Sequence, residues 1–348
     1  MATTTGVYHT SYSADLALRH TRLEHVRLVF ALAVVVALPF YASPFWLNVL
    51  DQIGIAIIGA IGLNILVGYT GQISLGQGGF LAVGAYTAGV VVTKSDLSPL
   101  VGIPAAVLVT AAVGAFFGLP ALRLKGLYLA IATLASQQII VWLIIHWDWL
   151  TGGVGALVLE PVSVFGWTPT GDFQWYWVIM GFAALATVTA TNLFRTGVGR
   201  AFVAIRDHDI AAEAIGVDPA RYKVLAFAVS SAYVGLAGAL TAYWTQILTW
   251  ERFTLDVSIL YLAMIIVGGL GSVSGAIYGA AFMIALPSYL DQLSLRVSPD
   301  SFLARDLPGI KLLIFGLTIV LFLVFEPKGL ARIWQRAKDY LRLWPFRY

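Results

Sequence analysis

Long apolar stretches separated by short polar breaks run along the chain from residue 28 to residue 326. Each stretch approaches the roughly 20 apolar residues that a helix needs to cross a hydrocarbon core of about 30 Å. The pattern predicts an all-α, polytopic integral membrane protein with about 10 transmembrane helices. These helices are expected near residues 28–47, 49–68, 72–93, 100–120, 126–147, 175–194, 224–247, 256–271, 273–290 and 309–326.

Two glycine-dense stretches interrupt this pattern. Residues 268–272, Gly-Gly-Leu-Gly-Ser, either divide two short helices or lie inside one re-entrant element. Residues 68–79 interleave glycines with Gln, Ser and Thr. Broken helices at membrane depth are tolerated only where they are buried or line a cavity, and in transporters they mark binding sites. Because glycines also allow helices to pack closely, both stretches are open to two interpretations, a transport pathway or close packing.

The basic residues indicate which side each loop faces, since cytoplasmic loops of membrane proteins carry an excess of Lys and Arg. With the N-terminus inside, sixteen of the 21 basic residues fall on cytoplasmic segments and five on the outer side. Both termini are therefore predicted to be cytoplasmic. The resulting divisions are a cytoplasmic N-terminal segment (1–27), a transmembrane domain (28–326) with a large cytoplasmic loop at 195–223, and a cytoplasmic tail (327–348).

The composition agrees with a surface covered by lipid. Of 348 residues, 59% are hydrophobic and 11% are charged, whereas an ordinary soluble domain has roughly 25% charged residues. The chain has no cysteine, which excludes disulfides and thiolate metal sites. A net charge of +3 is too small to indicate a nucleic-acid partner.

Both ends of the chain carry further signals. The N-terminal apolar run is either a first membrane helix or a signal peptide, and its continuation past Ser43 into a second apolar stretch favours the helix. The tail is predicted to form an amphipathic helix over residues 331–344 that binds lipid at the inner membrane surface. Its apolar face comprises Ile333, Ala337, Leu341 and Trp344. An interfacial tryptophan belt is predicted for Trp147, Trp149, Trp175 and Trp177.

Neutral polar residues supply most of the polarity within the predicted helices. Asp51, Asp256 and Asp291 fall near helix ends, so the mid-depth carboxylate that ion-coupled carriers use is not evident. Amides and hydroxyls can hydrogen-bond a polar solute without burying a charge, or they can simply join helices. The candidate pathway residues are Asn64, Gln72, Ser74, Gln77 and Gln138.

The loop at 195–223 has the signals of a helix, a turn and a second helix. Asp207 or Asp209 is predicted to cap a short helix over residues 210–215, and Gly216 to end it in the left-handed conformation. Asp218-Pro219 then restarts a helix. Ile205, Ile210, Ala214 and Ile215 would form an apolar surface that either a partner protein or the membrane interface covers.

At this loop, residues 206–218 resemble the coupling loop of ABC importer permeases, with Ala-Glu-Ala-Ile-Gly at 212–216. From residue 50 onward, most of the chain resembles the LivM-type permease subunit of branched-chain amino acid ABC transporters. The motifs that carry this resemblance lie at residues 68–79, 128–135, 151–153, 199–216, 235–239, 268–272 and 325–330.

The resemblance implies a permease that forms the pathway for branched-chain or related amino acids in the bacterial inner (plasma) membrane. The implied partners are a second homologous permease subunit, two cytoplasmic ABC ATPase subunits and an extracytoplasmic solute-binding protein. The implied coupling residues are Arg206, Asp209, Glu213 and Gly216. The sequence has no phosphate-binding Gly-x-x-x-x-Gly-Lys-[Ser/Thr] loop, so we expect the partner subunits to bind ATP and this chain to have no cofactor.

Two departures from the family pattern leave the substrate open. Gln138 stands where the family often has Glu, and Val154 follows the Thr-Gly-Gly motif where Asn or Asp is usual. The alternatives are a permease for urea, amides or aromatic acids, and a self-contained ion-coupled carrier or channel. An enzyme is not expected, because the five histidines are scattered along the chain.

Overall fold

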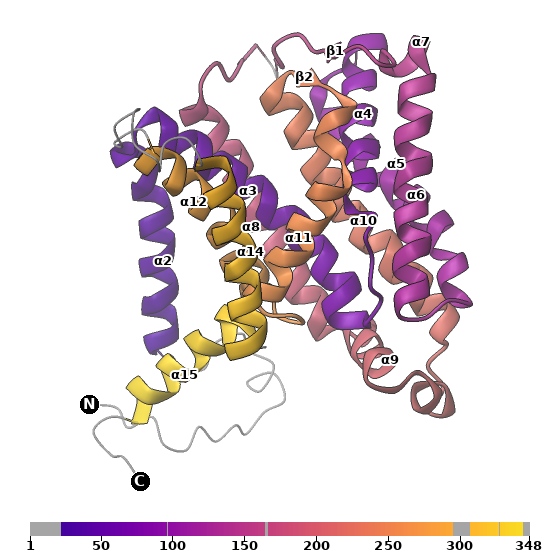
Figure 1. Ribbon diagram of the computed structural model, residues 1–348, viewed down its shortest axis with the longest axis vertical. Helices are drawn as coiled ribbons and strands as arrows, with labels where there is room; N and C mark the ends of the chain where they lie inside the picture. The colour runs from indigo at the N-terminus through magenta and orange to yellow at the C-terminus, as the bar shows by residue number, and fades with distance from the viewer. Residues whose placement is uncertain (1–21, 96, 164–165, 295–306, 327, 344–348) are drawn as a thin grey trace.

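The computed structural model describes residues 22–95, 97–163, 166–294, 307–326 and 328–343, and helices dominate it (Figure 1). Each of the predicted apolar stretches corresponds mainly to one helix, and the stretch at 28–47 also includes the first residues of the next. These helices are α2 (Arg22–Tyr41), α3 (Pro44–Asn64), α4 (Gln77–Ser95), α5 (Pro99–Gly118), α6 (Leu127–His146), α8 (Asp172–Arg195), α10 (Pro219–Thr245), α11 (Leu255–Gly268), α12 (Val273–Ser294) and α14 (Leu307–Phe325).

Further elements lie between these helices or after the last of them. They are the π-helix η1 (Ile65–Tyr69) that continues α3, the 3-10 turns η2 (Pro120–Leu122) and η3 (Trp250–Phe253), and the helices α7 (Asp148–Thr151), α9 (Gly197–Ala214) and α15 (Gly329–Leu343). The strands β1 (Leu157–Val158) and β2 (Ile247–Leu248) pair antiparallel, with Leu157 opposite Leu248. In Figure 1 the strands and α7 lie at one end of the molecule, here called the strand end, and α9 and α15 lie at the other, the α9 end.

Six helices in the described ranges are long and apolar enough to cross a membrane. They span Pro44–Tyr69, Pro99–Gly118, Leu127–His146, Asp172–Arg195, Pro219–Thr245 and Val273–Leu293. The all-α, multi-pass class is therefore confirmed, while the total of about 10 spans stays a prediction. α11 illustrates the difference, because a helix of its 14 residues is only about 21 Å long.

Helix α10 lies at the centre of the fold and packs against α3, α4 and α5. Small residues make this packing possible. A Cβ added to Gly84 of α4 would lie 2.5 Å from the Cα of Gly235 in α10. A Cβ added to Gly238 would collide with the backbone of Leu81. The α4 and α10 backbones are thus in direct contact, as small residues allow in membrane helices.

The structure settles the geometry of both glycine-dense stretches. Residues 268–272 divide two helices, α11 and α12, and do not lie inside one element. The predicted helix at 72–93 began too early, because α4 begins at Gln77 and residues 71–76 are non-helical. Gly71, Gly269 and Gly271 have φ values of 69°, 122° and 71°, in a region that favours glycine.

The predicted tail helix is present as α15. Its Trp334 ring contacts the Tyr278 ring of α12 at a centroid distance of 6.4 Å, while Trp344 lies outside the described residues, as does most of the N-terminal segment. Among the predicted belt tryptophans, Trp175 is buried and the belt assignment is wrong for it, whereas Trp147, Trp149 and Trp177 are exposed.

Candidate functional site

The two glycine-dense breaks meet at the α9 end, and we call residues 68–76 and 268–272 together the glycine node. Asn64, which is buried at the end of α3, joins them. Its Nδ2 donates to the carbonyl of Ser272 at 2.7 Å, and its Oδ1 accepts from the backbone N–H of Gly271 at 2.9 Å. The Asn64 amide therefore holds the α11–α12 turn against the end of α3.

The first half of the node is held by its own polar side chains. The Thr70 hydroxyl donates to the carbonyl of Leu66 at 2.5 Å, and Gln72 Nε2 donates to Thr70 Oγ1 at 3.0 Å. The backbone N–H of Gln72 also donates to Leu66 at 3.1 Å, and that of Gly76 to Ser74 Oγ at 3.3 Å. Gln72 Oε1 is buried and has no hydrogen-bond partner within the described part of the chain.

Gln77 fixes the start of α4. It is buried, and its Nε2 donates to the carbonyl of Gly59 in α3 at 2.9 Å. This contact joins two helices, so three of the candidate pathway residues, Asn64, Ser74 and Gln77, are engaged with backbone groups.

The structure places Gln138 apart from the other candidates, on the exposed surface of α6. Its neighbour Gln137 is buried and accepts from Ser258 Oγ at 2.7 Å, while its Nε2 donates to the carbonyl of Phe253 at 3.3 Å. Gln137 thus joins α6 to α11 and η3, a role that the sequence analysis missed. The signal was its spacing of four residues from Thr133, because both lie on the buried face of α6.

Arg206 connects α9 to the glycine node. Its Nη1 donates to the carbonyl of Gly68 at 3.0 Å, and a Cβ added to Gly71 would lie 3.2 Å from its Cγ. Its Nη2 also pairs with the Asp207 carboxylate at 2.9 Å. Immediately afterwards α9 is interrupted, because His208 has φ −164° and ψ 101°. The last turns of α9 therefore change direction at His208, two residues after Arg206, which binds the glycine node.

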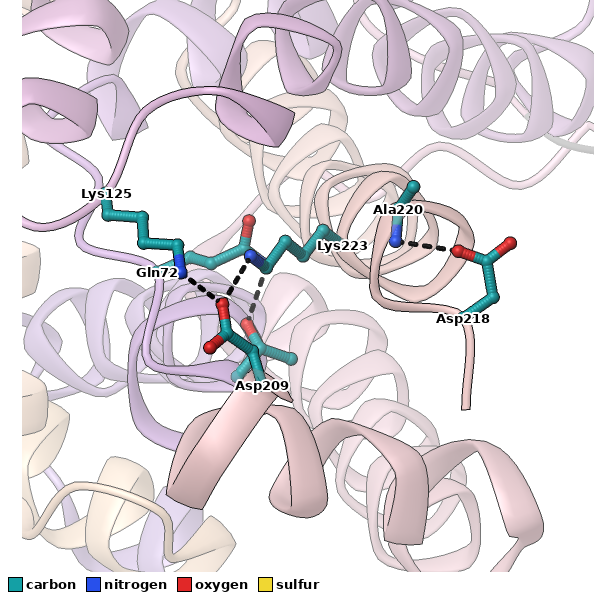
Figure 2. A network of polar contacts seen from close by, with 7 residues as sticks. Gln72, Lys125, Asp209, Asp218, Ala220 and Lys223 are labelled. Carbon is teal, nitrogen blue, oxygen red and sulfur yellow. Dashed lines mark hydrogen bonds and ion pairs between the residues drawn. The ribbon is translucent and has the colours of Figure 1, made fainter. Parts of the chain in front are cut away.

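Asp209 lies between two lysines from other elements (Figure 2). Its carboxylate is 2.5 Å from Lys125 Nζ and 3.4 Å from Lys223 Nζ. The hydrogen bond from Lys125 and that from Lys223 hold the pKa of the Asp209 carboxyl below its ordinary value. The predicted capping role is wrong, because the carboxylates of Asp207 and Asp209 bind basic side chains in place of backbone N–H groups.

The predicted turn after α9 is confirmed. Gly216 has φ 90°, its N–H donates to the Glu213 carbonyl at 3.0 Å, and the N–H of Val217 donates to Ala212 at 3.0 Å. This pair of bonds defines a Schellman motif. Asp218 caps α10 as predicted. It accepts from the N–H of Ala220 at 2.9 Å (Figure 2) and from that of Arg221 at 3.3 Å.

The end of α9 presents an apolar surface. The side chains of Ile210 and Ile215 are 68% and 78% exposed, and Glu213 between them is exposed as well. Ile205 was expected to belong to this surface, but it is buried because it lies on the other side of the His208 interruption.

A cavity of about 280 Å³ lies between the glycine node and α9. Gln72, Lys125, Arg206 and Asp209 line it, so it contains the amide with the unpartnered acceptor oxygen and the charged groups that hold α9 in place. The arrangement brings together Arg206 and Asp209 with Gln72, while Glu213 and Gly216 lie farther along the loop.

Comparison with known proteins identifies the family of this chain. Residues 45–323 match the family described as "Branched-chain amino acid transport system / permease component". The chain is 32% identical to the high-affinity branched-chain amino acid transport system permease protein LivM of Escherichia coli strain K12, and equally to that of Salmonella typhimurium strain LT2. In both comparisons the match covers 87% of this chain and 74% of the relative.

A more distant relative is the probable branched-chain amino acid transport permease protein LivM of Methanocaldococcus jannaschii, which is 23% identical over 79% of this chain and 82% of its own. No solved structure matches the chain. The resemblance noted in the sequence is thereby confirmed, and the chain belongs to the LivM-type permeases of the branched-chain amino acid transport family.

Proposed function

We propose that the chain is the permease subunit of an ABC importer for branched-chain or related amino acids, and that α9 couples it to a cytoplasmic ATPase. Family membership supports the class of transport. The observation that carries the coupling is the hydrogen bond from Arg206 to the carbonyl of the buried Gly68, because it joins α9, just before its exposed last turns, to the glycine node.

The end of α9 has the features of a docking helix. Ile210 and Ile215 leave apolar surface exposed beside the charged Glu213. A short amphipathic helix of this kind buries its apolar face in a groove of a partner. We assign the partner as an ABC ATPase, which would bind the ATP, with Arg206, Asp209, Glu213 and Gly216 forming the coupling element.

Movement of this element would reach the pathway by two routes. Arg206 binds the glycine node directly. Asp209 binds Lys125, which precedes α6, and Lys223 in the first turns of α10. A displacement of α9 on ATP binding would therefore shift the node and two long helices together.

The candidate pathway residues divide into two groups under this proposal. Asn64, Ser74 and Gln77 hold the broken segments in shape. Gln72 lines the cavity beside α9, and its buried acceptor oxygen has no hydrogen-bond partner within the described residues, so it is the candidate that a solute would reach if the node moves. Gln138 faces away from the core of this chain, toward lipid or the second permease.

The orientation follows from the same assignment. With α9 on the cytoplasmic side, the strand end faces outward, where the solute-binding protein would dock. Both termini would be cytoplasmic and about 10 helices would cross the inner membrane of a bacterium. The basic residues at the α9 end, including Lys125, Arg206 and Lys223, support this orientation.

The experiment that tests the proposal is purification of the tagged chain from its native membranes in mild detergent, with mass spectrometry of the proteins recovered. We expect a second permease and P-loop ATPases, and we expect Glu213→Lys to lose the ATPases. Glu160→Lys, the same charge reversal in an outer loop, should retain them. Recovery of the chain alone, active in liposomes without ATP, would establish a self-contained carrier or channel.

A further inference from the structure

A second cavity, of about 560 Å³, opens among α3, α8, α10, α11 and α12, away from the glycine node. The last turn of α10 lines it through Thr241 and Thr245, so it lies toward the strand end of the molecule (Figure 1). Its volume is within the range of roughly 300–1,000 Å³ that is usual for small-molecule sites. We call it the strand-end cavity.

The strand-end cavity contains one charge of each sign. Asp172, at the start of α8, and Arg252, in η3, both line it. Neither side chain has an ion-pair partner within 4.0 Å in the part of the chain that the structure describes. Two opposite charges in one cavity, each left without a protein partner, are complementary to a ligand that carries both charges.

Amide groups add to this polar lining. Asn48 and Gln52, one turn apart on α3, line the cavity, and Gln52 Nε2 donates to Asn48 Oδ1 at 2.9 Å. This bond fixes the two amides relative to each other and leaves the Asn48 NH₂ as a donor and the Gln52 oxygen as an acceptor.

Apolar side chains complete the cavity. Ile55 of α3 and Leu260 and Met264 of α11 line it, and Ile55 and Met264 are buried. Asn48 and Gln52 precede Ile55 along α3, while Leu260 and Met264 lie beyond Arg252 along the chain, so the polar groups lie nearer the strand end and the apolar groups deeper.

We propose that the strand-end cavity is a binding site for a zwitterionic α-amino acid with an aliphatic side chain. Arg252 binds the carboxylate, Asp172 binds the ammonium group, and Leu260 and Met264 contact the side chain. This assignment rests on the proposed import function and narrows its substrate class. Urea and simple amides have no charge to match Arg252 or Asp172, and an aromatic acid without an amino group matches only Arg252.

The test uses the complete transporter, reconstituted in proteoliposomes with its solute-binding protein loaded with radiolabelled leucine. Both uptake and ATP hydrolysis are measured, and leucine transported per ATP is the readout. We expect Arg252→Gln and Asp172→Asn each to lower this ratio by about tenfold, since each removes a charge-assisted hydrogen bond. Lys94→Gln and Glu160→Gln, matched charge removals outside the cavity, should leave it unchanged.

Arg252→Lys keeps the positive charge and is expected to retain more of the ratio than Arg252→Gln, which separates substrate binding from loss of local structure. Unchanged ratios in both cavity variants would overturn the assignment. So would a parallel loss of uptake and stimulated ATP hydrolysis, because that result identifies a docking contact for the binding protein. If the unmodified transporter accumulates no leucine with ATP, the proposed function itself fails.

Discussion

Gln137 and Gln138 show what is decided at the scale of single residues. They are neighbours in the sequence, yet α6 turns them about 100° apart, so one is buried and the other exposed. The sequence places both in an apolar helix but does not state which face meets the rest of the protein. The buried residues Thr133 and Ile140 show which face of α6 points into the protein. That they are buried is known only once the packing of α6 is known.

At Arg206 we predict that substitution uncouples ATP hydrolysis from transport. Arg206→Gln removes the charged donor to Gly68, and uptake per ATP is expected to fall by about tenfold. The control is Arg200→Gln, since Arg200 is an exposed arginine of the same helix that donates to Arg195 and does not contact the glycine node. If the two variants had the same uptake per ATP, Arg206 would have no specific role in coupling.

At Asp209 we predict a loss of stability with a defined pH dependence. The pKa of this carboxyl is lowered by Lys125 and then by Lys223, so its stabilising effect is present above the ordinary pKa of about 3.9 and disappears only as the pH falls through the lower folded-state value. Asp209→Asn should therefore lower the thermal unfolding temperature in detergent equally at pH 7 and pH 5.

The size of the Asp209 effect is expected to be about 1 kcal/mol or less, because the partner Lys125 is exposed. The double variant with Lys125→Met should be less destabilised than the sum of the single variants, since both remove the same contact. Strict additivity, or an effect that vanishes at pH 5, would contradict the ion pair.

At the scale of elements, the sequence predicted those helix ends and caps that depend only on interactions between neighbouring residues. Gly216 ends α9 in the left-handed conformation and Asp218 caps the start of α10, and both of these predictions are confirmed. The cap was wrong for Asp209 because two lysines from other elements, Lys125 and Lys223, bind its carboxylate. It was wrong for Asp207 because that carboxylate pairs with the adjacent Arg206. The late start of α4 likewise depends on a distant contact, the bond from Gln77 to Gly59.

For the turn between α9 and α10 we predict that Gly216→Val impairs transport without preventing membrane insertion. The left-handed φ of 90° costs a residue with a Cβ roughly 1–2 kcal/mol, so the end of α9 should lose its position. Gly197→Val is the matched control, because Gly197 lies in α9 without a positive φ and an added Cβ there would meet only the end of the Arg200 side chain, at 4.0 Å. Uptake and membrane content are measured for both.

For the contact between α4 and α10 we predict a folding defect. In Gly238→Val the new side chain would collide with the backbone of Leu81 and come within 2.8 Å of the Ala85 nitrogen, and overpacking of this kind costs about 1–3 kcal/mol. Size-exclusion chromatography should show less monodisperse protein. Gly181→Val, at a glycine of α8 with open space around it, should behave like the unmodified protein.

At the scale of the whole molecule, the apolar pattern predicted the helices but not their neighbours. Asn64 binds a turn more than 200 residues away in the sequence, and Arg206 binds a carbonyl 138 residues away. Such contacts join helices of similar composition, and the sequence of one apolar helix does not indicate which other helix it packs against. The sequence therefore could not predict that both glycine breaks lie together beside α9.

The orientation of the whole molecule can be tested directly because the chain has no cysteine. Single cysteines introduced at Ala211, in α9, and at Glu160, near the strands, provide one reporter for each end. We expect a membrane-impermeant maleimide to label Glu160→Cys in intact spheroplasts and Ala211→Cys only after the membrane is opened. The reverse pattern would invert the proposed topology.

Helix α10 begins at the Asp218 cap, beside Lys223 and the coupling element, and ends with Thr241 and Thr245 in the wall of the strand-end cavity. Its 27 residues make a rod about 40 Å long. If such a rod pivots near its base, a tilt of about 5° displaces its far end by roughly 3.5 Å. A small rotation at the proposed ATPase contact would thus be amplified, by leverage along one rigid helix, into a displacement at the opposite face of the membrane that exceeds the diameter of a water molecule.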